Sequence, residues 1–121
     1  MGPERKLWHE LKKNTPGITW NRIENTAGIG MPDCLGYNTN RHFFTVELKV
    51  TKANKINFSP HQIAWHVEHP NDTFILVRAL GPGTLKLFPG SMVRALVTEG
   101  YACGSQAPGS WSTVLEHLLA C

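Results

Sequence analysis

The chain has 121 residues, of which 41% are hydrophobic and 17% charged, and this composition suits one folded domain. No apolar run approaches the ~20 residues that span a membrane, and no apolar stretch follows the charged N-terminus as it would in a signal peptide. The three cysteines form no Cys-x-x-Cys pair, so we expect neither disulfides nor a cysteine zinc site, and we expect a cytoplasmic protein. The net charge of +3 is a mild indication of a nucleic-acid partner.

Periodicity and turn residues predict helices and strands in the order α-β-β-β-α-β-β-α-α. Helices are expected over residues 3–13, from 59 onward, and over 89–99 and 110–120. Strands are expected over residues 18–23, 33–37, 42–50, 73–80 and 84–88. No linker or internal repeat divides the chain, so this order implies a single α/β sandwich in which helices flank a mixed sheet.

The strand over residues 42–50 has the most informative pattern. Its even-numbered positions are all apolar: Phe44, Val46, Leu48 and Val50. Because side chains alternate between the two faces of a strand, Glu47 and Lys49 must share the opposite face. A five-residue loop over 38–42 would place Asp33 directly across from Glu47, whereas a four-residue loop would turn Asp33 toward the core. We therefore predict the longer loop or a bulge.

Asp33 and Glu47 are candidate ligands of a hard divalent cation such as Mg²⁺, with Mn²⁺ as a substitute, because such cations prefer oxygen donors. The backbone carbonyl of Leu48 would complete the protein's share. Lys49, on the same face, would orient an attacking water or stabilise negative charge during hydrolysis of a phosphodiester. The alternative is a solvated edge strand on which Glu47 and Lys49 form an ordinary ion pair.

Several segments of the chain follow one another in an order that is typical of one nuclease superfamily. They are Trp20-x-Arg22-Ile23-Glu24-Asn25, Gly30-Met31-Pro32-Asp33, Glu47-Leu48-Lys49 and Ser59-Pro60-x-Gln62-x-x-Trp65. Over residues 3 to about 80 the chain resembles PD-(D/E)XK nucleases, and more closely the virus-type replication-repair nuclease (VRR-NUC) domain and archaeal-type Holliday junction resolvases.

This resemblance implies a restriction-endonuclease-like fold, with metal bound by Asp33 and Glu47 and with Lys49 as the catalytic lysine. It also implies that Gln62 reaches the active site from the start of its helix, as a further catalytic residue. The family usually has one more acid. Glu24, which follows a strand close to the active loop, is slightly favoured over Glu4, which lies on the apolar face of the first helix. Glu10 does not lie on that face, and Glu4 also suits the first turn of a helix as a plain partner of the helix dipole.

Candidate DNA contacts surround this site. The loop over residues 51–58 carries Lys52 and Lys55, which would bind phosphates if they are not simply solvated. Arg22, Ser59 and His61 are further candidates. The three histidines of one helix region, at positions 61, 66 and 69, are not spaced to share one helical face, so we expect surface or helix-end histidines rather than a zinc site.

Together these patterns predict a Mg²⁺-dependent DNA endonuclease that is selective for DNA structure, such as a Holliday junction resolvase. Two symmetric cuts imply a homodimer, and residues 89–121, which match no known motif, would form a helical C-terminal extension that supplies the interface. No small-molecule cofactor is expected, and the format suggests a phage protein that acts in a bacterium. The alternatives are a nicking or restriction-type nuclease with a short sequence preference, and a DNA-binding module without catalysis.

Overall fold

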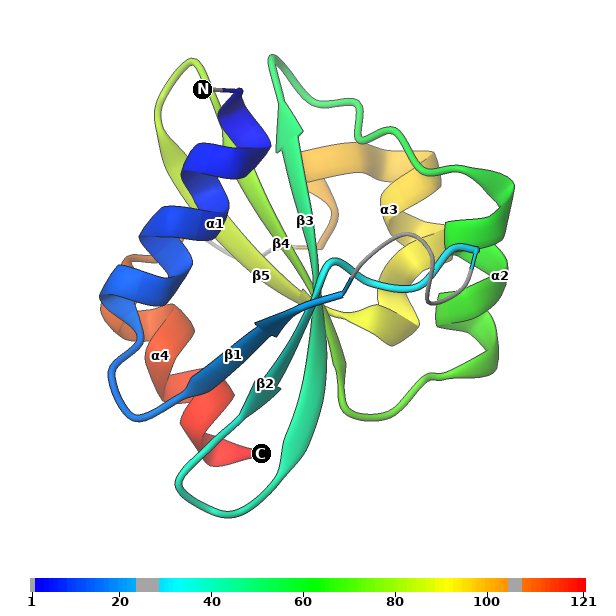
Figure 1. The fold of residues 1–121 in the computed structure, drawn as a ribbon. Coiled ribbons are helices and arrows are strands. Elements are labelled where there is room, and N and C mark those ends of the chain that lie inside the picture. Colours follow the sequence, from blue (N-terminus) through cyan, green and yellow to red (C-terminus); the bar gives the residue numbers. More distant parts are fainter. Residues whose placement is uncertain (1, 24–28, 105–107) are drawn as a thin grey trace.

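The computed structural model describes residues 2–23, 29–104 and 108–121, and its central layer is a five-stranded sheet (Figure 1). The strands are β1 (Thr19–Arg22), β2 (Cys34–Tyr37), β3 (Phe43–Thr51), β4 (Thr73–Ala79) and β5 (Thr84–Pro89). They lie in the order β1-β2-β3-β4-β5, and every neighbouring pair is antiparallel except β3 and β4, which are parallel. The predicted mixed sheet is therefore confirmed.

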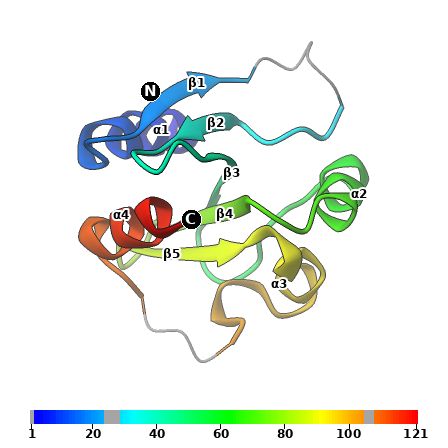
Figure 2. The same ribbon diagram turned by 90° about the horizontal axis from the view of Figure 1, so that it is seen from below.

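Helices cover both faces of this sheet, so the predicted α/β sandwich is also confirmed. Figure 2 shows α1 (Pro3–Asn14) and α4 (Trp111–Ala120) on one face, and α2 (Pro60–Glu68) and α3 (Val93–Glu99) on the other. The helix expected over 89–99 is divided into a short 3-10 turn, η2 (Gly90–Met92), and α3, and a second such turn, η3 (Gly100–Ala102), follows α3. Because β3 and β4 are parallel, α2 serves as the crossover between them.

Each face of the sheet has its own apolar core. The alternation predicted along β3 is confirmed on one face, where Phe44, Val46 and Leu48 are almost fully buried beneath α1 and α4. The second core lies beneath α2 and α3, with Ile75, Val77, Phe88, Val93 and Leu96 among its members. β3 is the middle strand of the sheet, and Glu47 on its second face is only 1% exposed. The alternative of a solvated edge strand is therefore wrong.

Residues 89–121 are built into the domain. Val93 and Leu96 of α3 belong to one core, and Val114 and Leu118 of α4 belong to the other. The expected extension is therefore part of the sandwich, and its role in a dimer stays a prediction. The three cysteines are free, as expected. Within the described ranges, no helix is long and apolar enough to cross a membrane.

Candidate active site

The hairpin of β2 and β3 has the predicted register. Cys34 pairs with Val46, and the connecting loop runs over residues 38–42, so the next position outward brings Asp33 opposite Glu47. The five-residue loop predicted from strand alternation is confirmed. Two carboxylates that are distant in the sequence therefore meet on one face of the sheet.

Asp33 directly precedes the first residue of β2, and it accepts hydrogen bonds from two backbone N–H groups. Its Oδ2 accepts the Leu48 N–H at 2.7 Å, and its carbonyl accepts the Ile23 N–H at 2.8 Å. The N–H and the C=O of one residue in a strand point to the same side. The Leu48 carbonyl therefore also points to the side of β3 on which Asp33 lies. Leu48 lies beyond Val46, the last residue of β3 that pairs with β2, and its carbonyl oxygen has the direction that a metal ligand would need.

Gly30 explains the glycine-rich lead-in to Asp33. Its φ of +82° lies in the left-handed region that glycine favours. A Cβ at this position would also lie 2.3 Å from the His61 carbonyl oxygen, in the first turn of α2. The segment before Asp33 therefore packs directly against the helix that carries Gln62.

Glu47 is buried in the middle of the sheet, with a relative exposure of 1%. Its Oε2 accepts a hydrogen bond from Gln62 Nε2 at 3.3 Å, and its Oε1 has no hydrogen-bond partner among the described residues. Burial first, and then the adjacent Asp33 carboxyl, raise the pKa of Glu47. Without a cation, this pair of carboxyl groups retains a proton that an exposed glutamate would lose.

Lys49 is the positive charge of the site. Its Nζ donates hydrogen bonds to the Asn57 carbonyl at 2.6 Å and to Gln62 Oε1 at 2.9 Å, and it lies 4.8 Å from the centroid of the Phe58 ring. Gln62 consequently bridges Glu47 and Lys49 with the two ends of one amide group.

The position of Gln62 follows from the start of α2. Ser59 is the N-cap, and its hydroxyl accepts the Gln62 N–H at 3.1 Å, while Gln62 Oε1 accepts the Ser59 N–H at 3.0 Å. This reciprocal pair is a capping box. The residues that predicted the start of the helix are thus the same ones that bring Gln62 to the acids.

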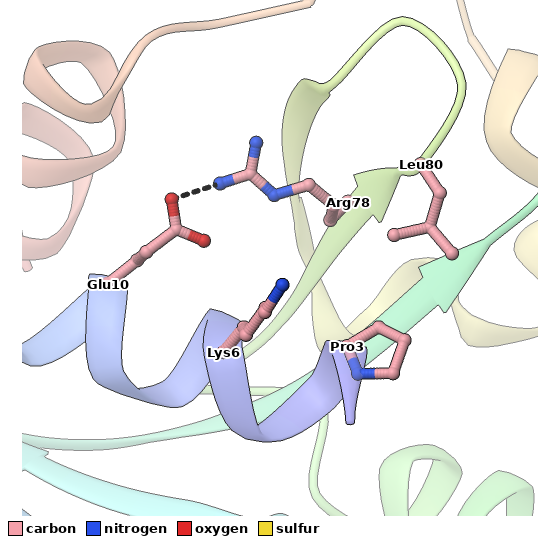
Figure 3. A pocket seen from close by; sticks show the side chains of 5 residues that line it. All are labelled: Pro3, Lys6, Glu10, Arg78 and Leu80. Atoms are coloured by element: carbon pink, nitrogen blue, oxygen red, sulfur yellow. Dashed lines mark hydrogen bonds and ion pairs between the residues drawn. The ribbon is translucent and has the colours of Figure 1, made fainter. Parts of the chain in front are cut away.

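The candidates for a third acid have different surroundings, which distinguish them. Partial burial and the Asp33 carboxylate raise the pKa of Glu4, whereas Lys49 and Arg22 lower it, so this side chain lies within the field of the site. Glu10 instead forms an ion pair with Arg78 at 2.9 Å, in a separate pocket of about 200 Å³ (Figure 3). Glu24, the slightly favoured candidate, lies outside the described residues.

The predicted DNA contacts are arranged around the same edge of the domain. Lys52 and Lys55 are exposed and line a cavity of about 500 Å³, together with Asn57, whose carbonyl accepts a hydrogen bond from Lys49. Arg22 is exposed, and its guanidinium lies 5.4 Å from the centroid of the Trp8 ring. Ser59 and His61 are exposed at the first turn of α2.

His66 is a residue that sequence reasoning misplaced. His66 lies in the last turn of α2, as a helix-end histidine would, but it is not at the surface, because the residue is 0% exposed and its Nε2 lies 3.9 Å from Glu47 Oε1. Burial, then Lys49 and His69, lower its pKa to about 4. A signal was available, since His66 follows Gln62 by four residues and helical residues four apart share a face.

The donors of the site fit Mg²⁺. Among the residues that the structure describes, no group of three His, Cys, Asp or Glu side chains could hold a metal ion. Asp33, Glu47 and the Leu48 carbonyl supply oxygen alone, and Mg²⁺ commonly takes one or two carboxylates and keeps several waters. The Glu47 oxygen without a hydrogen bond and the raised pKa of its carboxyl indicate that Lys49 alone does not offset the burial of these acids.

No family model matches the sequence, and no curated protein matches it either. Among solved structures, the chain is similar to Hjc from Archaeoglobus fulgidus, a Holliday junction resolvase from an archaeal hyperthermophile. The TM-score is 0.54, the identity is 21%, and the match covers 74% of each chain. The resemblance to archaeal-type resolvases predicted from the sequence is therefore confirmed at the level of the fold.

Proposed function

We propose that this protein is a divalent-metal-dependent DNA endonuclease that cuts branched DNA in the manner of a Holliday junction resolvase. The observation that carries the proposal is the convergence of Asp33, Glu47, Lys49 and Gln62 at one point of the sheet. The shared fold with an archaeal resolvase supports the same class of reaction.

Each side chain has a distinct task in this proposal. Asp33 and Glu47, with the Leu48 carbonyl, hold Mg²⁺ or Mn²⁺, which when bound neutralises phosphate charge and makes water more acidic. Lys49 orients the attacking water or stabilises the negative charge that develops on the phosphate. Gln62 fixes the distance between the lysine and the glutamate, since it is hydrogen-bonded to both.

DNA is the proposed partner, and no small-molecule cofactor is invoked. The loop with Lys52 and Lys55 borders the carbonyl that binds Lys49, so a phosphate backbone could follow it into the site. Two symmetric cuts in a four-way junction need two active sites, and we therefore propose a homodimer. Its interface would draw on residues 89–121, where Val97 of α3 is 46% exposed.

The test is cleavage of labelled duplex, flap, splayed-arm, single-stranded and four-way-junction DNA with Mg²⁺ or Mn²⁺. We expect paired, symmetric cuts in the junction. Asp33→Ala and Lys49→Ala should each lower the rate by about 10²-fold or more, because each removes a group that acts on the transition state.

Glu10→Gln is the matched control, since this acid of α1 faces Arg78 and should leave cleavage unchanged. Cuts at a short sequence in linear duplex would favour a nicking or restriction-type enzyme. Binding of DNA without cleavage under either metal would leave only the DNA-binding module and would refute the enzyme.

A further inference from the structure

Unpartnered polar atoms gather behind Glu47, on the side away from Lys49. In the described part of the chain, the buried side-chain atoms without a hydrogen-bond partner are Glu47 Oε1, both ring nitrogens of His66, and Thr45 Oγ1. Leaving such atoms unpaired in the interior is unfavourable, because they have given up their hydrogen bonds to water. Glu47 and His66 face one another across 3.9 Å, so they can satisfy each other.

The fold leaves His66 little freedom to turn away. The ring lies edge-on to Trp65, with the two centroids 5.2 Å apart. On its other nitrogen, Nδ1, it is closed off by Gly90, where an added Cβ would lie 2.9 Å away. Gly90 carries no positive φ, so glycine is needed here for the close approach alone. The imidazole is therefore packed with Nε2 toward the glutamate.

We infer that His66 is a positioning residue, which donates its Nε2–H to Glu47 Oε1 when Glu47 binds the metal and so aims the other oxygen at the cation. The inference rests on the proposed function in one respect, namely that Glu47 is a metal ligand. The separation of 3.9 Å exceeds a hydrogen bond by about 1 Å, so a small rotation of the carboxylate closes it.

The two oxygens of the Glu47 carboxylate have different neighbours, and this difference supports the role. Oε2 is hydrogen-bonded to Gln62, which also holds Lys49, whereas Oε1 has no hydrogen bond among the described residues and lies 3.9 Å from His66 Nε2. Carboxylates that bind metals are commonly oriented by a second hydrogen bond from the protein. A neutral imidazole is suited to this task because it has one N–H donor.

The first test measures the affinity of the full chain for Mn²⁺ alone by electron paramagnetic resonance. His66→Phe keeps the ring shape but has no donor, and we expect 10- to 100-fold weaker binding, roughly the loss seen when outer-shell partners are removed. His66→Gln places an amide nitrogen near Nε2 and should restore most of the affinity. His69→Phe, on the exposed end of the same helix region, should bind as the wild type does.

The second test needs no variant and therefore does not depend on how well His66→Phe folds. Long-range ¹H–¹⁵N NMR of the wild-type protein should show the Nε2–H tautomer of His66 and a shift of that nitrogen on addition of Mg²⁺. An Nδ1–H tautomer, or a ring that does not respond to Mg²⁺, would overturn the inference.

The two proposals fail in different ways. Wild-type Mn²⁺ affinity in a folded His66→Phe variant refutes the role of His66, even if DNA is cut. Metal binding that depends on His66 without cleavage of any DNA refutes the nuclease and leaves the positioning role supported. A wild-type protein that binds no Mn²⁺ overturns both.

Discussion

Glu47 is the residue whose situation differs most from that of an ordinary strand glutamate. It sits in the middle strand between two apolar cores, with the Gln62 amide, the Asp33 carboxyl group and the His66 ring among its neighbours. Taking a carboxylate out of water is unfavourable unless a charge compensates it. In the metal-free protein the group responds by holding its proton more tightly, and this has a measurable consequence.

We predict that the metal-free protein becomes less stable as the pH rises above the ordinary glutamate pKa of 4.5. The unfolded chain loses this proton near that pH while the folded protein still holds it, so the folded state binds more protons. The free energy of unfolding then falls by up to about 1.4 kcal/mol per pH unit until the raised pKa is reached.

Urea unfolding in EDTA from pH 5 to pH 9 measures this effect, with Glu47→Gln as the variant that cannot titrate. The difference between wild type and variant should change with pH. Added Mg²⁺ should reduce the wild-type loss, since the metal binds the ionised form. Parallel stability curves in EDTA would show that Glu47 has no raised pKa.

At the scale of elements, the first turn of α2 both stabilises the helix and positions a side chain of the candidate site. Ser59 and Gln62 cap the helix, and the same Gln62 amide holds Glu47 and Lys49. The helix α4 offers a comparison, because its N-cap Ser110 accepts the Thr113 N–H at 3.4 Å without any link to the site.

We predict that Ser59→Ala and Ser110→Ala each lower the free energy of unfolding by about 1 kcal/mol, the usual loss of an N-cap side chain. Only Ser59→Ala should also reduce the rate of DNA cleavage, because it loosens the capping box that orients Gln62. Equal rates of DNA cleavage for the two folded variants would show that the Ser59 cap has no effect on the site.

The elements also show what the sequence could predict. The period-2 pattern of β3 and the loop over 38–42 were sufficient to place Asp33 opposite Glu47, because a wrong register would have moved every apolar side chain to the other face. Ser59 and Pro60 located the start of α2, because capping depends on nearby residues.

The misplaced features depend on packing between distant segments. His66 is buried only because α2 lies over β3 and Gly90 comes close to its ring, and neither contact can be derived from the spacing of histidines. In the same way, the helix expected over 89–99 is interrupted where Gly90 packs against Thr73. Such contacts arise from tertiary structure, and local periodicity indicates only that His66 shares a helical face with Gln62.

At the scale of the whole molecule, the proposed function assigns metal binding to the acids of the site and phosphate binding to the basic residues around it. The basic loop of residues 51–58 is fixed to the opposite end of the chain through Asn54, whose side chain donates to the Glu99 carbonyl and accepts the Ala102 N–H, both at 2.8 Å. Lys52 and Lys55 are therefore carried on a loop that the body of the domain holds in place.

We predict that Lys52→Gln and Lys55→Gln weaken binding to junction DNA and reduce its dependence on salt. Each lost phosphate contact should lower the slope of log affinity against log salt concentration by about 0.9. Lys13→Gln, at the far end of α1, is the control with an unchanged slope. Fluorescence anisotropy in Ca²⁺ or EDTA measures binding without cleavage, and unchanged slopes for both loop variants would remove the loop from the DNA interface.

The side chains proposed to act on the phosphate, and the histidine behind them, all lie in residues 33–66, which comprise the strands β2 and β3 and most of the crossover helix α2. The surrounding elements α1, α4 and β5 contribute mainly apolar volume, and cores accept many hydrophobic exchanges that keep volume and pattern. Over evolutionary time, most of the chain can therefore drift without moving the site. Relatives of this protein are best sought by the spacing of a few polar residues on a common backbone outline, rather than by percentage identity.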